Sequence, residues 1–125
     1  MDDAGTIMWE ALLGSIMEEK ARSLSIFPDY DDLEHTLSFG GSRFLGVQLG
    51  EEYWFYKLDC TGPFLFERLY GGNGNEAILK AMTRLNETIL LGCTDSSNSG
   101  TLLGLYSNGQ KDAWILKVDA NGNPY

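Results

Sequence analysis

The chain has 125 residues, of which 43% are hydrophobic and 22% charged, a composition that suits one soluble globular domain with a modest core. Its formal net charge of −9 excludes the usual phosphate-binding proteins and disfavours anionic membrane surfaces, because both need clusters of Lys and Arg. Fifteen glycines, three prolines and many aromatic residues favour strands joined by tight turns.

The first stretch, residues 5–14, is compatible with two structures. Its apolar spacing and good helix formers allow a helix that continues beyond it. Residues 62–71 repeat the stretch at a constant offset, with Trp9 matching Phe66. A proline and a glycine pair flank the aromatic run of the second copy, so a strand is favoured over residues 6–12.

The negative charge is concentrated near the N-terminus. Residues 1–34 hold nine acidic and two basic side chains, whereas residues 35–125 hold nine acidic and seven basic ones. A solubilising face is one interpretation, and a patch that attracts a basic partner is the other. The candidate partner-binding residues of this region lie in a turn-rich insert: Asp29, Asp31, Asp32 and Glu34.

Short apolar runs separated by turn residues predict the remaining strands. A glycine-rich loop follows the strand that ends at residue 70, at residues 71–75, and a polar loop follows the strand that ends at residue 94, at residues 95–100. The predicted strands are residues 22–27, 35–42, 53–59, 63–70, 77–83, 88–94 and 113–119.

The clearest pattern is a repeat. Residues 54–59 (WFYKLD) return sixty positions later as residues 114–119 (WILKVD), and a glycine follows each Asp three positions on. Residues 36–42 match residues 88–94, which places Gly40 against Gly92. We therefore predict two diverged copies of one unit, marked by Trp9, Trp54, Lys57, Asp59, Gly62, Trp114, Lys117, Asp119 and Gly122.

Within the two tryptophan strands, side chains alternate between faces. Trp54, Tyr56 and Leu58 share one face of the first strand, and Phe55 lies on the other with Lys57. Large apolar residues on both faces predict strands that are covered on both sides by neighbouring sheets.

No group of residues has the pattern of a catalytic or cofactor site, so we assign no catalytic, metal or cofactor-binding residue and expect no enzyme. The single histidine, His35, is interpreted as a surface residue rather than a base. Residues 119–123 space oxygen ligands as in the start of a calcium loop, but a turn in which Asp119 accepts backbone amides is favoured. Cys60 and Cys93 fall in no metal-like spacing, and reduced thiols are favoured over a disulfide.

Aromatic side chains are the candidates for ligand contacts, since such rings stack against sugars, although most of them also suit a core. Tyr106 is the one least suited to a core, and Asn108 shares its loop. These two residues complete the candidate partner-binding set.

The repeat in this chain resembles that of bacterial and archaeal β-propellers, which has the form D-x-W-x-x-K-x-D-x-x-G-N, followed by Y-G-G and G-x-T. The resemblance rests on residues 112–123, on Tyr70-Gly71-Gly72 and on residues 88–94. Phe66 departs from the pattern, where the family favours Trp, and so do residues 25–34.

The resemblance implies an all-β fold of two four-stranded blades in circularly shifted order, within one domain of residues 1–125. One blade would span roughly residues 15–72, and the other residues 73–125 together with residues 5–13. Two blades do not close a ring, because propellers need about four to eight. We therefore expect head-to-tail self-association into a trimer or tetramer, with the N-terminal strand of one chain completing the last blade of the next.

The expected function is a non-enzymatic binding or scaffold protein that presents loops to a protein or glycan partner, not to nucleic acid or membrane. The alternative is a small acidic inhibitor or immunity-type protein that blocks a basic surface through residues 18–34. As written, the chain carries no signal peptide and is expected in the cytoplasm, or secreted if a leader has been removed.

Overall fold

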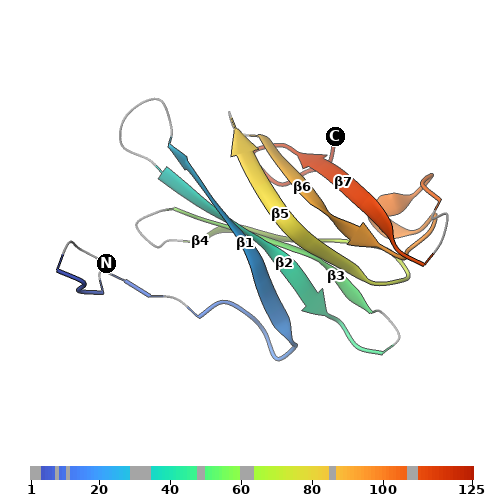
Figure 1. The fold of residues 1–125 in the computed structure, drawn as a ribbon, viewed down its shortest axis with the longest axis horizontal. Coiled ribbons are helices and arrows are strands. Elements are labelled where there is room, and N and C mark those ends of the chain that lie inside the picture. The colour runs from blue at the N-terminus through green and yellow to red at the C-terminus, as the bar shows by residue number, and fades with distance from the viewer. Residues whose placement is uncertain are drawn as a thin grey trace.

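The described residues form seven antiparallel strands, which make two sheets that pack face to face (Figure 1). The computed structural model describes residues 4–7, 9–10, 12–28, 35–47, 50–59, 64–84, 87–106 and 110–125. The first sheet has four strands in chain order: β1 (Glu19–Pro28), β2 (His35–Phe44), β3 (Glu51–Asp59) and β4 (Phe64–Tyr70).

The second sheet has three strands, again in chain order: β5 (Glu76–Arg84), β6 (Glu87–Thr94) and β7 (Asp112–Val118). A short 3-10 helix, η1 (Gly100–Leu102), lies in the long connection between β6 and β7. The all-β prediction is confirmed, and each of these strands overlaps a predicted one closely. The described part of the chain holds no helix long and apolar enough to cross a membrane.

The pairing registers of the two sheets have the same irregularity. Arg22 is skipped in the pairing of β1 with β2, and Leu79 is skipped in the pairing of β5 with β6. Each of these bulges faces a glycine of the next strand, Gly41 or Gly92. Both glycines leave no room for a side chain, because a Cβ would strike the carbonyl oxygen of the residue before the bulge, on Lys20 or Ala77.

This register corrects one detail of the predicted alignment. Gly41 pairs with Trp54, and Gly92 pairs with Trp114, so the two glycines occupy the same position in their sheets. The sequence alignment had placed Gly40 there instead. Two consecutive glycines look alike in a sequence, and only the strand pairing distinguishes which of them faces the tryptophan.

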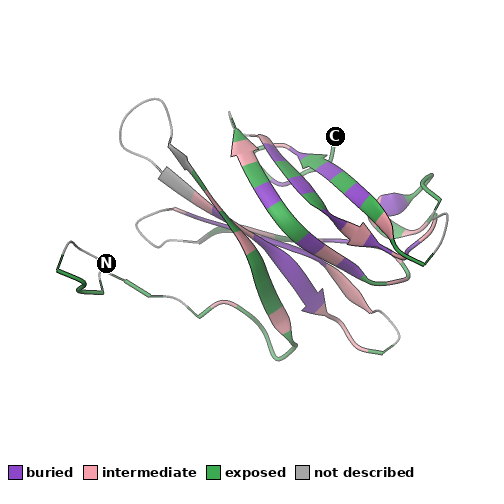
Figure 2. Cartoon of the chain, viewed as in Figure 1, coloured by how far each residue is buried: buried purple, intermediate pink, exposed green. Residues whose placement is uncertain are grey.

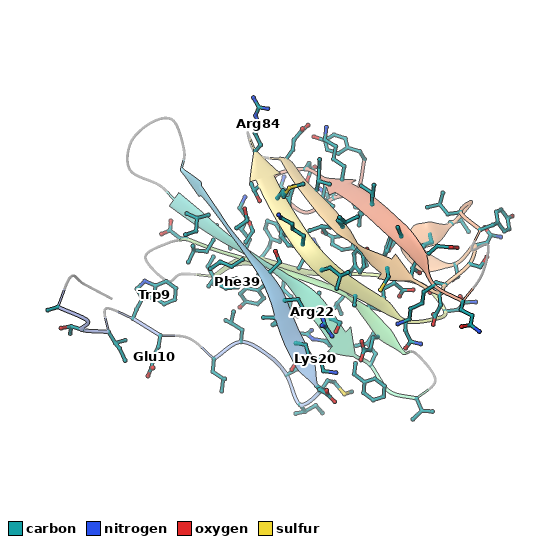
Figure 3. All side chains as sticks on the ribbon, viewed as in Figure 1. Trp9, Glu10, Lys20, Arg22, Phe39 and Arg84 are labelled. Atoms are coloured by element: carbon teal, nitrogen blue, oxygen red, sulfur yellow. The ribbon has the colours of Figure 1, made fainter. Side chains whose placement is uncertain are left out.

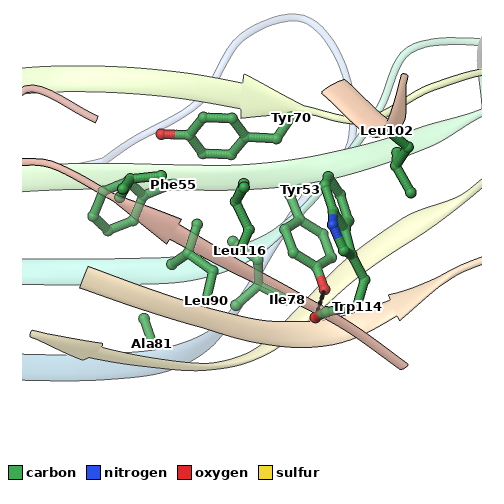
Figure 4. Packing of buried hydrophobic residues seen from close by; sticks show 10 residues of the cluster. Tyr53, Phe55, Tyr70, Ile78, Ala81, Leu90, Leu102, Trp114 and Leu116 are labelled. Atoms are coloured by element: carbon green, nitrogen blue, oxygen red, sulfur yellow. Dashed lines mark hydrogen bonds between the residues drawn. The ribbon is translucent and has the colours of Figure 1, made fainter. Parts of the chain in front are cut away.

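The core lies between the sheets and is shown in Figure 4. From the first sheet, Tyr53 and Phe55 point inward and are fully buried. From the second sheet, Trp114 points towards them, and its ring lies 4.4 Å from that of Tyr53. The rest of the cluster comes from β4, the second sheet and η1: Phe66, Tyr70, Ile78, Ala81, Leu90, Leu102, Leu116 and Val118.

Polar contacts join the sheets at the edge where β1 crosses β5. The backbone amide of Ala81 donates to the hydroxyl of Ser23 (2.9 Å), and the amide of Thr83 donates to that of Ser25 (3.4 Å). The edge of β5 is therefore covered by side chains of the first sheet. Among the described strands, β7 pairs only with β6; its other edge carries an isolated bridge between Val118 and Pro124 at one end, and the rest of that edge is open to the described residues.

The N-terminal segment does not form the predicted strand within this chain. Residues 5–7, 9–10 and 12–13 are neither strand nor helix, and Leu12 is fully exposed. The physical reason is distance: Figure 1 places this segment beside the first sheet, whereas the open β7 edge belongs to the far side of the second sheet. The linker at residues 14–18 spans at most about 18 Å when extended.

Candidate functional site

Three surfaces of the described chain are candidates for binding: a cleft at the loop end of the second sheet, and the outer face of each sheet. Four predicted partner residues, Asp29, Asp31, Asp32 and Glu34, lie outside the described residues, as do Asn108 and Gly62. Of the predicted candidates, Tyr106 is described, and its side chain is 69% exposed.

Tyr106 lies at the rim of a cleft of about 390 Å³. Trp114 and Leu102 form its apolar wall, while Asp112, Thr94 and Ser96 supply oxygen atoms. The loop before η1 is held in shape by Asn98, whose side-chain oxygen accepts the amide of Gly104 (2.8 Å). An exposed aromatic ring beside hydroxyl and carboxylate groups suits a sugar or a polar peptide.

A buried carboxylate lies beneath this cleft. Glu76 is 1% exposed, and it accepts hydrogen bonds from the hydroxyls of Thr94 (2.8 Å) and Ser96 and from the amide of Gly72 (3.3 Å). Glu52 lies nearby, and its pKa is raised by burial and then by the charge of Glu76. Because its oxygens accept hydrogen bonds from three donors on two segments, residues 94–96 and Gly72, Glu76 acts as a structural anchor of the loops.

The first sheet contains the corresponding anchor at Glu19. The amide of Ser15 donates to its carboxylate (3.1 Å), as the amide of Gly72 does to Glu76. Arg43 forms an ion pair with Glu19 (2.9 Å) and a second one with Glu67. The two anchors hold the turn that precedes the first strand of each sheet.

The outer face of the first sheet carries the aromatic residues that were predicted to share one side of β3. Trp54 is 3% exposed, its ring lies beneath the Arg43 guanidinium (5.3 Å), and Tyr56 meets it edge-on (5.8 Å). The Trp54 indole nitrogen is buried without a hydrogen-bond acceptor in the described part of the chain. A cavity of about 260 Å³ adjoins the ring, and Leu13 of the N-terminal segment and Phe39 line it.

Towards β1 this face becomes open. On β1, the side chains of Leu24 and Ile26 are 57% and 60% exposed. They lie later in the sequence than the N-terminal residues that partly cover Trp54. Figure 3 shows Trp9 on that N-terminal segment and Phe39 on β2. We call the outward-pointing set of the first sheet the Trp54 face: Ala21, Leu24, Ile26, Leu37, Phe39, Trp54, Tyr56 and Leu58.

The outer face of the second sheet is also apolar, and none of the described residues covers it. Figure 2 shows the alternation of buried and exposed residues along β5, β6 and β7 that leaves one face to solvent. Ile115 is 68% exposed at its centre. We call this set the Ile115 face: Leu79, Met82, Ile89, Leu91, Cys93, Ala113 and Ile115.

Basic side chains surround the Ile115 face. Lys80 and Arg84 are exposed on β5, and Arg84 points away from the end of that strand in Figure 3. Lys117 pairs with Glu87 (2.8 Å) and lies over the Tyr125 ring (4.8 Å). The rim therefore has three basic groups and one acidic group.

The other predicted repeat positions are structural in the chain. Lys57 is 8% exposed and lies 5.8 Å from the Phe66 ring. Asp119 accepts the amides of Asn121 and Asn123, both at 2.9 Å, so the predicted Asp turn is confirmed, and these hydrogen bonds lower the pKa of its carboxyl. Gly122 is buried, and its carbonyl accepts the hydroxyl of Tyr70.

Sequence reasoning missed the Ile115 face as a surface and the role of Glu76. Glu76 had a signal, because it matches Glu19 at the offset that relates residues 5–14 to residues 62–71. The described residues contain no group of three His, Cys, Asp or Glu side chains that are placed to hold a metal ion. No protein-family model and no curated protein sequence matches this chain.

Proposed function

We propose that this protein is a non-enzymatic β-sheet binding protein that self-associates head to tail and presents its loop-end cleft to a protein or glycan partner. The observation that carries the proposal is the Ile115 face, where Leu79 and Met82 of β5 and Ile115 of β7 are 47–68% exposed, with Ile89 and Leu91 of β6 between them. Contiguous apolar patches of this kind on a soluble chain mark interaction surfaces.

The similarity of the two sheets supports an array of repeated units. Both carry a bulge opposite a glycine, Gly41 or Gly92, and both begin after a turn anchored by a glutamate, Glu19 or Glu76. We interpret them as two copies of one blade-like unit. Units of this kind bury their faces against neighbouring units, so two units alone leave two faces uncovered.

The N-terminal segment supplies a second link. The offset of 57 positions relates residues 7–13 to β4, residues 14–18 to the loop after it, and residues 19–27 to β5. In the first sheet β4 pairs with β3, and the corresponding place beside β7 holds no strand among the described residues, only a bridge from Pro124 to Val118 at one end. We propose that residues 5–13 of one chain pair with β7 of the next and form its fourth strand, which in a closed ring gives a trimer or tetramer.

Light scattering across a dilution series tests the proposal. We expect a mass of three or four chains that is stable to dilution. Ile7→Pro should reduce the mass to that of the monomer, because proline removes an amide and cannot continue a strand, whereas Ile7→Val should leave it unchanged. A folded monomer at all concentrations for the unaltered chain would refute self-association.

The binding role of the cleft needs a separate test. Glycan-array and pull-down measurements on the unaltered protein should identify a ligand whose binding is reduced by Tyr106→Ala. Leu103→Ala, at an exposed position in the same connection but outside the cleft, serves as the control. Equal loss or equal retention of binding in both variants would exclude the cleft as the binding site.

A further inference from the structure

The packing of the two sheets within the chain has a direction. The second sheet presents its Trp114 side, with Leu116 and Val118, to the first sheet. The first sheet contacts it through Tyr53 and Phe55, on the side opposite to its own tryptophan, Trp54. The internal interface therefore joins a tryptophan-bearing face to a face without tryptophan.

In each sheet, the face of the other kind takes no part in the interface between the two sheets. The strand registers make Trp54 the counterpart of Trp114, and make Ile115 the counterpart of Phe55. The Trp54 face thus corresponds to the buried side of the second sheet, and the Ile115 face corresponds to the buried side of the first. One chain carries both halves of a second interface on opposite sides, so two of its copies are needed to form it.

We infer that the Trp54 face of one copy packs on the Ile115 face of the next copy, in the same arrangement as the interface inside the chain. This inference rests on the proposed self-association and names the surfaces that produce it. Contacts that join unlike faces are head-to-tail, so they extend or close an array rather than stopping at a dimer.

The charges around the two faces support this pairing. The Ile115 face is bordered by Lys80, Arg84 and Lys117, with Glu87 as the acidic exception. The Trp54 face is followed and preceded by the acidic N-terminal region, in which residues 1–34 have nine acidic and two basic side chains. Regions of opposite net charge in the sequence attract each other, which favours contact between unlike faces.

Among the described residues of one chain, the Trp54 ring lacks a hydrogen-bond acceptor for its indole nitrogen and leaves space beside it. It is buried at 3% exposure, its indole N–H has no acceptor in the described residues, and a cavity of about 260 Å³ adjoins it. Such a buried donor is costly when it is not satisfied. Backbone or side-chain oxygens of the arriving sheet would supply the acceptor.

The covering N-terminal residues are compatible with this arrangement. Leu13 lines the cavity at Trp54, so residues near it must move when a second copy docks. In the proposed array, residues 5–13 leave that side to pair with β7 of the same neighbour. Both contacts join the same two copies. Within the chain, the loop after β4 leads directly into the second sheet, which packs on the sheet that contains β4. Residues 5–13 correspond to β4, and they lead in the same way into the first sheet of their own copy.

A disulfide between copies provides a direct test. Inside the chain, Gly40 faces Ile78, and a Cβ on Gly40 would lie 3.3 Å from the Ile78 Cβ, close to the spacing that a disulfide requires. The corresponding positions between copies are Leu91 and Ala21. These two residues lie on opposite outer sides of one chain, so they cannot bond within it.

The experiment uses Ala21→Cys together with Leu91→Cys in a background of Cys60→Ser and Cys93→Ser. Mild oxidation followed by non-reducing electrophoresis should show covalent dimers and larger species for the double-cysteine variant, while each single-cysteine variant should remain unlinked. Covalent dimers of Leu91→Cys alone would overturn the inference, because they require two Ile115 faces to meet.

A second variant tests the surface without engineered thiols. Ile115→Lys should raise the apparent dissociation constant at least about tenfold, because it places a charge in a buried contact, and Leu103→Lys should leave that constant unchanged. Suppose that the protein assembles, that the double-cysteine variant forms no cross-links, and that Ile115→Lys leaves the dissociation constant unaltered. This result would overturn the stacking of the two faces but not self-association. A monomeric parent protein would overturn both.

Discussion

The phenol hydroxyl of Tyr53 donates a hydrogen bond of 2.8 Å to the backbone carbonyl of Trp114, while the two rings pack 4.4 Å apart. One residue from each sheet thus makes an apolar and a polar contact at the same place. Burial raises the pKa of the Tyr53 hydroxyl, so it remains a donor throughout the neutral range. This pair fixes the second sheet against the first.

Replacing Tyr53 by Phe tests that contact, because it keeps the ring and removes the donor. We expect the free energy of unfolding to fall by about 1 kcal/mol, since the Trp114 carbonyl loses a partner in the core. Urea unfolding followed by circular dichroism measures the change. Tyr106→Phe is the matched control, and an unaltered midpoint for Tyr53→Phe would show that this bond does not contribute.

The bulge glycines predict a large loss of stability. A methyl group at Gly92 would collide with the Ala77 carbonyl oxygen, which belongs to the sheet backbone and cannot rotate away. We expect Gly92→Ala to lower the free energy of unfolding by about 2–4 kcal/mol. Cys93→Ala, on the next residue of the same strand, should change it little; equal effects of the two would contradict the steric explanation.

Glu52 predicts a dependence on pH. Its pKa in the folded chain is raised above 4.5 by burial, and further by the charge of Glu76, so folding favours the protonated form. That contribution to stability is complete below pH 4.5 and is lost as the pH rises through the folded pKa. Glu52→Gln should therefore stabilise the protein at pH 7, and the gain should disappear in acid.

Unfolding curves of the unaltered protein and of Glu52→Gln at several pH values measure this difference. Glu51→Gln removes an equal charge from the adjacent position and provides the control. A gain that persists unchanged below pH 4.5 would show that protonation of Glu52 is not its source.

The ion pair of Arg43 with Glu19 predicts a strong effect of truncation. Both side chains are about nine-tenths buried, so Arg43→Ala leaves the carboxylate of Glu19 without its cation. We expect a loss of about 3–5 kcal/mol in the free energy of unfolding. Lys117→Ala breaks an exposed pair with Glu87 and should cost far less, because solvent screens exposed charges, so similar losses would contradict a role for burial.

Much of the fold could be predicted from the sequence, because strand signals are local. The alternation around Trp54 and Trp114, and the glycine and proline residues between strands, gave all seven strands to within about three residues. The resemblance to propeller repeats implied the grouping of these seven strands into two sheets, and it also implied an eighth strand at residues 5–13 that the chain does not form by itself. These signals do not depend on how distant parts of the chain pack.

The remaining features depend on three-dimensional packing. The choice between Gly40 and Gly41 required the strand register, and the state of residues 5–13 depends on whether a neighbouring strand is within reach. The exposure of Ile115 was hidden because an apolar residue in a strand looks the same in the sequence whether it faces a core or solvent. The roles of the acidic insert and of Asn108 stay predictions, as does the alternative of an acidic inhibitor.

The serine hydroxyls of Ser23 and Ser25 have a consequence for how the molecule opens. The amides of Ala81 and Thr83 are held by side chains of the other sheet rather than by a neighbouring strand. Their hydrogen–deuterium exchange should therefore report the parting of the two sheets, whereas the amides within each ladder report the unravelling of a sheet. The same hydroxyls block strand addition at β5, which leaves β7 as the edge of the second sheet where a strand can be added.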